Sequence, residues 1–112
     1  MKLQAGRLRH RFQIQENRPN RDPESGAVVR AWVSIGQVWG SFEPLSARDF
    51  LAAAAAQTKI SARSVIRYKA YVKEKMRLLH RDRAFMIQGA LPDKESGREY
   101  LTLLLSEDLS DG

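Results

Sequence analysis

The sequence predicts a mainly β fold, a small antiparallel β-barrel of six or seven strands with one helical excursion. Alternation of apolar and polar residues recurs in four separate segments, and clusters of turn-forming residues separate these segments. Only one stretch of the chain carries a well-marked helix start. At 112 residues the chain is long enough to bury a core of its own, and we expect a single domain over residues 1–112.

The first strand is predicted over residues 10–17, where apolar and polar residues alternate. Its apolar face consists of Leu8, His10, Phe12 and Ile14. Residues 18–27 contain two prolines together with Asn, Asp, Ser and Gly, so we expect an exposed, flexible hairpin loop there. A second strand region follows over residues 28–43, in which the alternation shifts by one residue after Gly36. Such a shift requires a bulge or a break, which predicts one bent strand or two strands.

The helix start lies directly after Glu43 and Pro44. Ser46 stands three residues before Asp49, a spacing at which the serine hydroxyl accepts a first-turn N–H and the acid reaches back toward the cap. The alanine-rich residues that follow have high helix propensity but little apolar bulk. We therefore expect a helix over about residues 46–57 that docks on a surface or a neighbour. The predicted assembly interface consists of Trp39, Leu45, Ser46, Arg48, Asp49, Phe50 and Leu51.

The C-terminal half continues as strands. Clean alternation over residues 59–69 predicts a half-buried antiparallel strand with a basic outer face. That basic strand face consists of Lys59, Arg63, Arg67 and Lys69. Further strands are expected over residues 76–80, 84–91 and 98–107, separated by tight turns at 81–83 and 92–97. The tail, residues 108–112, is expected to fray.

The charges are distributed unevenly along the chain, whose formal net charge is +6. Residues 1–30 carry seven basic and three acidic groups, residues 59–83 nine and two, and residues 84–112 two and six. Opposite patches of this kind let a subunit dock head to tail on copies of itself or on an oppositely charged partner. The alternative is that the charges only keep the surface solvated.

Catalytic and metal-binding patterns are missing from the sequence. There is no cysteine, and the two histidines, His10 and His80, stand far apart without a metal-binding spacing. Nucleophile, phosphate-binding and dinucleotide-binding motifs do not occur. We therefore expect no enzymatic activity, no cofactor and no metal. No apolar run approaches the ~20 residues of a membrane span, and the first residues lack a signal core, so we expect an intracellular protein without a membrane partner.

Nucleic-acid binding is the alternative function, as in an oligonucleotide-binding barrel. The basic face of residues 59–69 continues into Tyr71 and further cations, which resembles a charged strand surface interleaved with aromatic residues. Tyr68 falls on the apolar face, however, so only Tyr71 remains as a stacking platform. Trp32 and Trp39 each fit a partly buried rim residue better than an interface anchor. A solvated or partner-facing strand therefore explains the basic face better.

Five short patterns, taken in order, carry a resemblance to a known family. They are Gly6 to Gln15, Trp32 followed by Val38 and Trp39, Glu43 to Phe50, Ile66 to Tyr68, and Phe85 to Gly89. Together they resemble the head–tail joining proteins of tailed bacteriophages and prophages, also called head-completion or head-closure proteins. The resemblance covers roughly residues 5–107.

The resemblance implies a structural virion protein. Such a protein is a small β-barrel subunit of a connector ring, commonly a dodecamer, that lies beneath the portal and its adaptor. The ring closes the DNA-filled head, offers a docking surface to tail-terminator or other tail proteins, and lets double-stranded DNA pass without reading its sequence. The resemblance thus implies assembly in the host cytoplasm and a final location at the head–tail connector of the virion.

Overall fold

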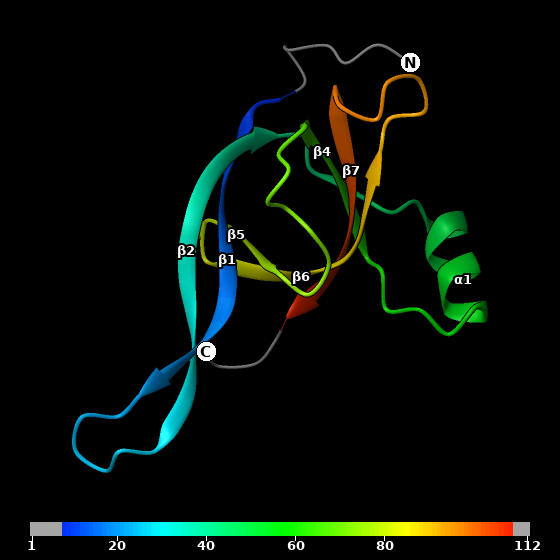
Figure 1. The fold of residues 1–112 in the computed structure, drawn as a ribbon. Coiled ribbons are helices and arrows are strands. Elements are labelled where there is room, and N and C mark those ends of the chain that lie inside the picture. Colours follow the sequence, from blue (N-terminus) through cyan, green and yellow to red (C-terminus); the bar gives the residue numbers. More distant parts are fainter. Residues whose placement is uncertain (1–7, 109–112) are drawn as a thin grey trace.

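The computed structural model describes residues 8–108, which form a mainly β structure with one helix (Figure 1). The elements are β1 (His10–Arg21), β2 (Val28–Gly40), β3 (Glu43–Pro44), α1 (Ala47–Ala55), β4 (Ala62–Arg67), β5 (Arg77–His80), β6 (Arg83–Pro92) and β7 (Tyr100–Asp108). The predicted frayed tail lies outside the described residues except for Asp108, which still belongs to β7.

The strands form one antiparallel sheet that closes on itself. The strand order is β2-β1-β5-β6-β7-β4-β3, and an additional pairing of Gly40 with Ile66 joins β2 to β4. Six strands therefore form a closed circuit, and β3 lies on the edge of β4. The predicted fold class, a mainly β antiparallel fold with one helix, is confirmed.

The core lies inside this closed sheet and follows the alternation read from the sequence. In β7, Leu101, Leu103 and Leu105 are buried while the residues between them are partly exposed. In β4, Ala62, Ser64 and Ile66 are buried in the same way. The largest side chains that are fully buried are Phe12, Phe85, Ile14, Ile66, Leu78, Ile87, Leu103 and Leu105.

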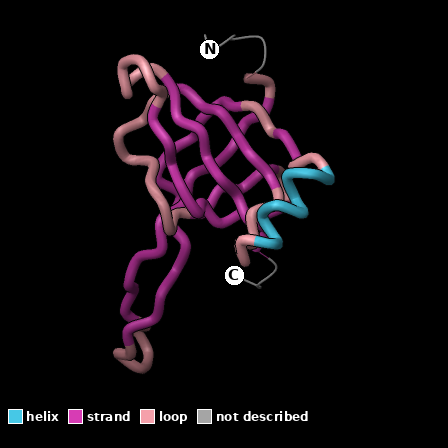
Figure 2. Tube along the Cα trace, turned by 90° about the vertical axis from the view of Figure 1, so that its right-hand side faces the viewer, coloured by secondary structure: helices cyan, strands magenta, loops and turns pink. Residues whose placement is uncertain are grey.

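The first two strands extend beyond the body of the sheet as a two-stranded arm, residues 16–33 (Figures 1 and 2). The prediction of a loop over residues 18–27 is wrong at its start, because residues 18–21 pair with residues 28–31 and only 22–27 form the loop. The composition indicates a turn there because Pro19 and Asn20 are turn-forming residues. A strand with one free edge tolerates a proline, since that edge needs no donor.

The shift of alternation near Gly36 is a β-bulge within one continuous strand. Ile14 pairs with Gly36 but the next residue, Gln15, pairs with Ser34, so Ile35 is the extra residue on β2. The predicted bulge is confirmed, and of the two forms allowed by the sequence the structure has the single strand. The side chain of Tyr71 occupies the place where a Cβ on Gly36 would stand. The glycine thus admits both the bulge and a close aromatic contact.

The turn between β6 and β7 is organised by one buried carboxylate, that of Asp93. Its Oδ2 accepts from the backbone N–H groups of Ser96 (2.8 Å) and Gly97 (3.1 Å), and its Oδ1 accepts from the N–H groups of Glu99 (2.8 Å) and Tyr100 (3.3 Å). Burial alone would raise the pKa of Asp93. The hydrogen bonds from Ser96, Glu99 and Tyr100 outweigh burial and hold that pKa well below its ordinary value.

Candidate assembly surface

Helix α1 begins and ends close to where the sequence predicts. Ser46 is the N-cap, with an extended backbone, and its hydroxyl accepts from the N–H of Asp49 at 3.1 Å. The C-cap is Ala56, and the following Gln57 has a left-handed backbone with φ of 60°. The backbone can reverse there because the left-handed conformation ends the helical hydrogen-bond pattern. The helix itself spans Ala47–Ala55, slightly less than the predicted 46–57.

The helix presents apolar side chains to solvent. None of the residues of α1 is buried, and Phe50 and Leu51 are 53% and 67% exposed. A helix of nine residues is not stable by itself in water, and most helices gain their stability by burying one face. Here the body of the protein covers no such face of α1.

Two contacts hold the helical excursion next to β4, at the point where the chain leaves the sheet and returns to it. The backbone N–H of Leu45 donates to the carbonyl of Ser61 at 3.0 Å, and the carboxylate of Asp49 lies 3.7 Å from the guanidinium of Arg63. Both charged side chains are about half exposed, so this ion pair contributes little to stability. The structure therefore brings one residue of the predicted helix interface together with one residue of the predicted basic face. Arg48 is exposed and Leu45 is partly buried.

Trp39 lies apart from the helix, next to the closure of the sheet. Its neighbour Gly40 pairs with Ile66, so Trp39 flanks the point where β2 meets β4. The ring is 55% exposed, with the guanidinium of Arg11 5.9 Å from its centre. No described contact joins Trp39 to α1, so the predicted interface residues do not form one continuous cluster in the described chain.

The basic strand face is smaller than predicted. Strand β4 covers Ala62–Arg67, so Lys59 and Lys69 lie in the connections that flank it and the strand-face interpretation is wrong for these two residues. Arg63 and Arg67 do alternate with the buried residues of β4 and point outward. The strand begins later than predicted because residues 59 and 60 are not paired with β7, and the first bond to β7 is the one that the N–H of Ser61 donates to the carbonyl of Leu105.

The two histidines meet in space although 70 residues separate them in the sequence. His10 Nδ1 and His80 Nε2 are 3.1 Å apart, within hydrogen-bonding distance. Burial, followed by the nearby His10, Arg81 and Arg83, lowers the pKa of His80. The distance between the two histidines along the sequence therefore did not predict that their side chains lie together in the fold. Even so, residues 8–108 contain no group of three or more side chains suited to hold a metal ion.

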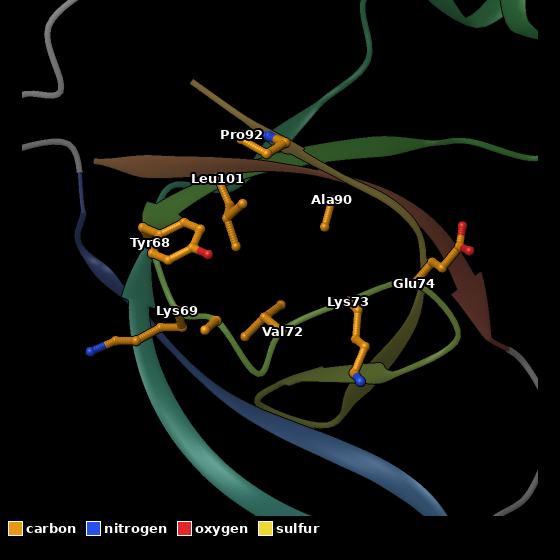
Figure 3. A pocket seen from close by; sticks show the side chains of 9 residues that line it. Tyr68, Lys69, Val72, Lys73, Glu74, Ala90, Pro92 and Leu101 are labelled. Atoms are coloured by element: carbon orange, nitrogen blue, oxygen red, sulfur yellow. The ribbon is translucent and has the colours of Figure 1, made fainter. Parts of the chain in front are cut away.

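The predicted stacking platform, Tyr71, is partly packed against β2. The hydroxyl end of Tyr71 packs against Gly36, and about a third of the residue is exposed. Tyr68 lines a hollow of about 250 Å³. Figure 3 shows Tyr68, Val72, Ala90 and Leu101 around this hollow, with the amine of Lys69 pointing away from it. Lys69, Lys73 and Glu74 also line it, beside these mainly apolar groups.

A second groove, at the base of the arm, was not predicted. Its volume is about 440 Å³, and its walls come from β1, β2, the segment before β5, and β6. The lining residues are Glu16, Asn17, Arg30, Trp32, Lys73, Glu74, Lys75, Met76 and Met86. Only the apolar and aromatic character of Trp32 gave a signal in the sequence, because the groove depends on where β1 and β5 separate.

No helix within the described residues is long and apolar enough to cross a bilayer.

The solved structures that match this chain include two that cover nearly all of it. The solution structure of protein SF1141 from Shigella flexneri 2a matches with a TM-score of 0.75 and 26% identity, covering 97% of this chain and all of that one. A chain from the virion of a native gene transfer agent particle matches with a TM-score of 0.58 and 17% identity, covering 93% of this chain and 98% of that one. The second match shows similarity of fold alone.

A comparison with curated proteins finds no significant match. The family model of the phage head completion protein matches residues 3–108. That range includes all the described strands and the helical excursion, in agreement with the resemblance seen in the sequence. The chain therefore belongs to the phage head completion protein family.

Proposed function

We propose that this chain is a structural, non-enzymatic subunit of a ring between the portal or its adaptor and the tail. The ring closes the DNA-filled head, accepts tail proteins and leaves a channel for double-stranded DNA. Its subunits assemble in the host cytoplasm and remain in the virion. Family membership supports the head-completion role. The position in a ring and the individual contacts are the proposal.

The exposed helix is the observation that carries this proposal. Phe50 and Leu51 expose their apolar side chains, and the polyalanine stretch beside them permits close approach of a neighbour. A monomer gains nothing by keeping a short helix whose apolar residues face water. A subunit that buries this helix against an adjacent copy recovers that free energy at about 25 cal/mol per Å² of apolar surface.

The outward-facing arginines of β4 support a contact with a neighbouring subunit at the surface that carries α1. Arg63 and Arg67 are exposed enough to pair with acidic side chains of a neighbour, and Arg63 already lies beside Asp49 at the start of the helix. Complementary charges at the rim of an interface set its register and speed association. We propose that the helix supplies the apolar centre of the contact and the arginines its charged edge.

Genetic complementation tests the proposal. In a phage that lacks this gene, the double variant Phe50→Ser/Leu51→Ser and the double variant Arg63→Glu/Arg67→Glu should fold but fail to produce tailed, DNA-filled heads. The matched control is Leu91→Ser, because Leu91 is also exposed (51%) but lies on β6. Circular dichroism checks folding, and electron microscopy scores heads that leak DNA or lack tails. Normal head completion by both folded double variants would contradict the proposed surface.

A further inference from the structure

The groove at the base of the arm arises where two paired strands separate. β5 pairs with β1 only over Gln13–Gln15. The segment before β5 stays with β6, since the N–H of Lys75 donates to the carbonyl of Ile87 and the N–H of Ile87 donates to the carbonyl of Met76, both at 2.9 Å. β1 instead continues into the arm, seen in Figure 1. The sheet is therefore open between residues 16–21 and residues 73–76.

The edge of β1 along this opening has no partner strand in the described chain. Residues 16–21 pair with β2 on one side, while β5 has ended on the other. An unpaired strand edge offers backbone N–H and C=O groups to an extended segment that can approach it. Here the edge that lines the groove is that of Glu16 and Asn17, since Pro19 has no N–H and closes it to pairing further along the arm. In addition, Asn17 Oδ1 is buried and accepts no hydrogen bond from the described residues. Such an atom is costly to leave unsatisfied, and a donor from an incoming segment would satisfy it.

The floor of the groove is apolar and held in place. Trp32, Met76 and Met86 line it. The guanidinium of Arg77 lies 4.5 Å from the centre of the Trp32 ring, and its Nε donates to Gln15 Oε1 at 2.8 Å. The tryptophan therefore has a fixed orientation before anything binds. Methionine side chains adapt to different apolar groups, so this floor suits one large apolar side chain of a ligand.

The charges around the groove favour an acidic ligand. Arg30, Lys73 and Lys75 line it and form no ion pair within residues 8–108. Of the two acidic lining residues, Glu16 already pairs with Arg18 at 3.3 Å. Glu74 is therefore the one acidic lining residue without such a pair among the described residues, against three cations. An acidic segment entering the groove gains from this excess of positive charge.

We propose that this groove binds an extended, acidic segment of a partner protein by β-strand addition. The segment pairs with the free edge of β1 before Pro19, at Glu16 and Asn17, and inserts one large apolar side chain against Trp32, Met76 and Met86. Its acidic residues lie near Arg30, Lys73 and Lys75. The free backbone edge favours a peptide over a nucleic acid, because a nucleic acid cannot continue a β-sheet. This surface is separate from helix α1 and does not depend on the proposed ring contact.

Tryptophan fluorescence provides a direct test. The chain has two tryptophans, so Trp39→Phe leaves Trp32 as the only reporter. The probe is the peptide acetyl-Glu-Thr-Asp-Leu-Asp-Thr-Glu-amide, with a copy in which lysine replaces each acid and with oligothymidylate as comparisons. Saturable change of Trp32 emission with the acidic peptide alone is the expected result. Tighter binding of oligothymidylate, or no binding of the acidic peptide, would overturn the proposal.

Variants of the protein and the peptide separate the elements of the proposal. Arg30→Glu/Lys73→Glu should weaken binding about tenfold or more. Lys94→Glu/Arg98→Glu, the same charge change on the β6–β7 turn, should not. N-methylation of alternate peptide N–H groups should abolish binding in one parity and spare it in the other, which only strand pairing explains. Equal effects of both charge variants, or of both parities, would refute the groove as the site. Phe50→Ser/Leu51→Ser should bind normally, which keeps this test independent of the helix.

Discussion

Replacement of Gly40 by alanine should destabilise the protein by obstructing the closure of the sheet. A Cβ on Gly40 would stand 2.7 Å from Ile66 Cγ2, 2.9 Å from Phe12 Cε2 and 2.9 Å from the carbonyl oxygen of Val65. Ile66 and Phe12 are fully buried, and the Val65 carbonyl is fixed because it accepts the N–H of Ser41 at 2.9 Å. None of the three can move aside freely. Overpacking of this kind costs about 1–3 kcal/mol, and the triple contact places Gly40→Ala near the upper end.

Gly89 provides the matched control, because a Cβ there would meet only Leu104 at an ordinary distance of 3.6 Å. Gly89→Ala should stabilise by about 0.4–1 kcal/mol through the lower entropy of the unfolded chain. For 112 residues, 1 kcal/mol corresponds to about 4 °C in Tm. With Gly40→Ala costing about 2–3 kcal/mol, the two alanine variants should differ by about 2.4–4 kcal/mol, or about 10–16 °C, in a thermal melt followed by circular dichroism. Equal melting temperatures would refute the view that closure at Gly40 has no room for a side chain.

Three further predictions concern the turn, the helix and the alternative function. The pKa of Asp93 is lowered in the folded protein, so its ionised form stabilises the fold above the ordinary pKa of aspartate, and this contribution is lost as the pH falls. The urea midpoint of Asp93→Asn should therefore lie below that of the parent protein at about pH 6, and the difference should shrink toward about pH 2. A difference that stays constant with pH would contradict the lowered pKa. Backbone hydrogen exchange should be fast over residues 46–57 and slow over 60–68 and 99–105, and uniform protection would argue against an undocked helix. Single-stranded DNA binding, measured by fluorescence anisotropy, should be weak, should fall steeply with salt and should be unchanged by Tyr71→Ala, whereas tight Tyr71-dependent binding at physiological salt would favour an oligonucleotide-binding barrel.

The parts of the fold that depend on local pattern were predictable from the sequence. Alternation identified the buried leucines of β7, because a strand with one buried face must alternate. The shift of that alternation located the bulge next to Gly36, and the spacing of Ser46 and Asp49 located the start of the helix. Each of these features is encoded within a few neighbouring residues.

Features that depend on contacts between distant segments were not predictable. Residues 18–21 join a strand because β2 is present to pair with them, although their composition is that of a turn. Lys69 falls outside β4 because β7 begins at Tyr100, opposite Arg67, and Lys59 falls outside it because β3 ends at Pro44, opposite Ala62. His10 and His80 meet because β1 and β5 are neighbours in the sheet. The groove at the base of the arm likewise depends on where two strands separate.

The root of the helical excursion has a consequence for how such proteins diversify. The chain leaves β4's edge at Leu45 and returns to it at Ser61, and a single backbone hydrogen bond of 3.0 Å joins these two residues. Residues 46–60 therefore form a loop whose ends are fixed side by side, while the closed sheet is complete without it. Lengthening, shortening or exchanging this insert should leave the register of the strands in the closed sheet unchanged. The same closed sheet can thus carry inserts of different length and shape toward different neighbouring proteins.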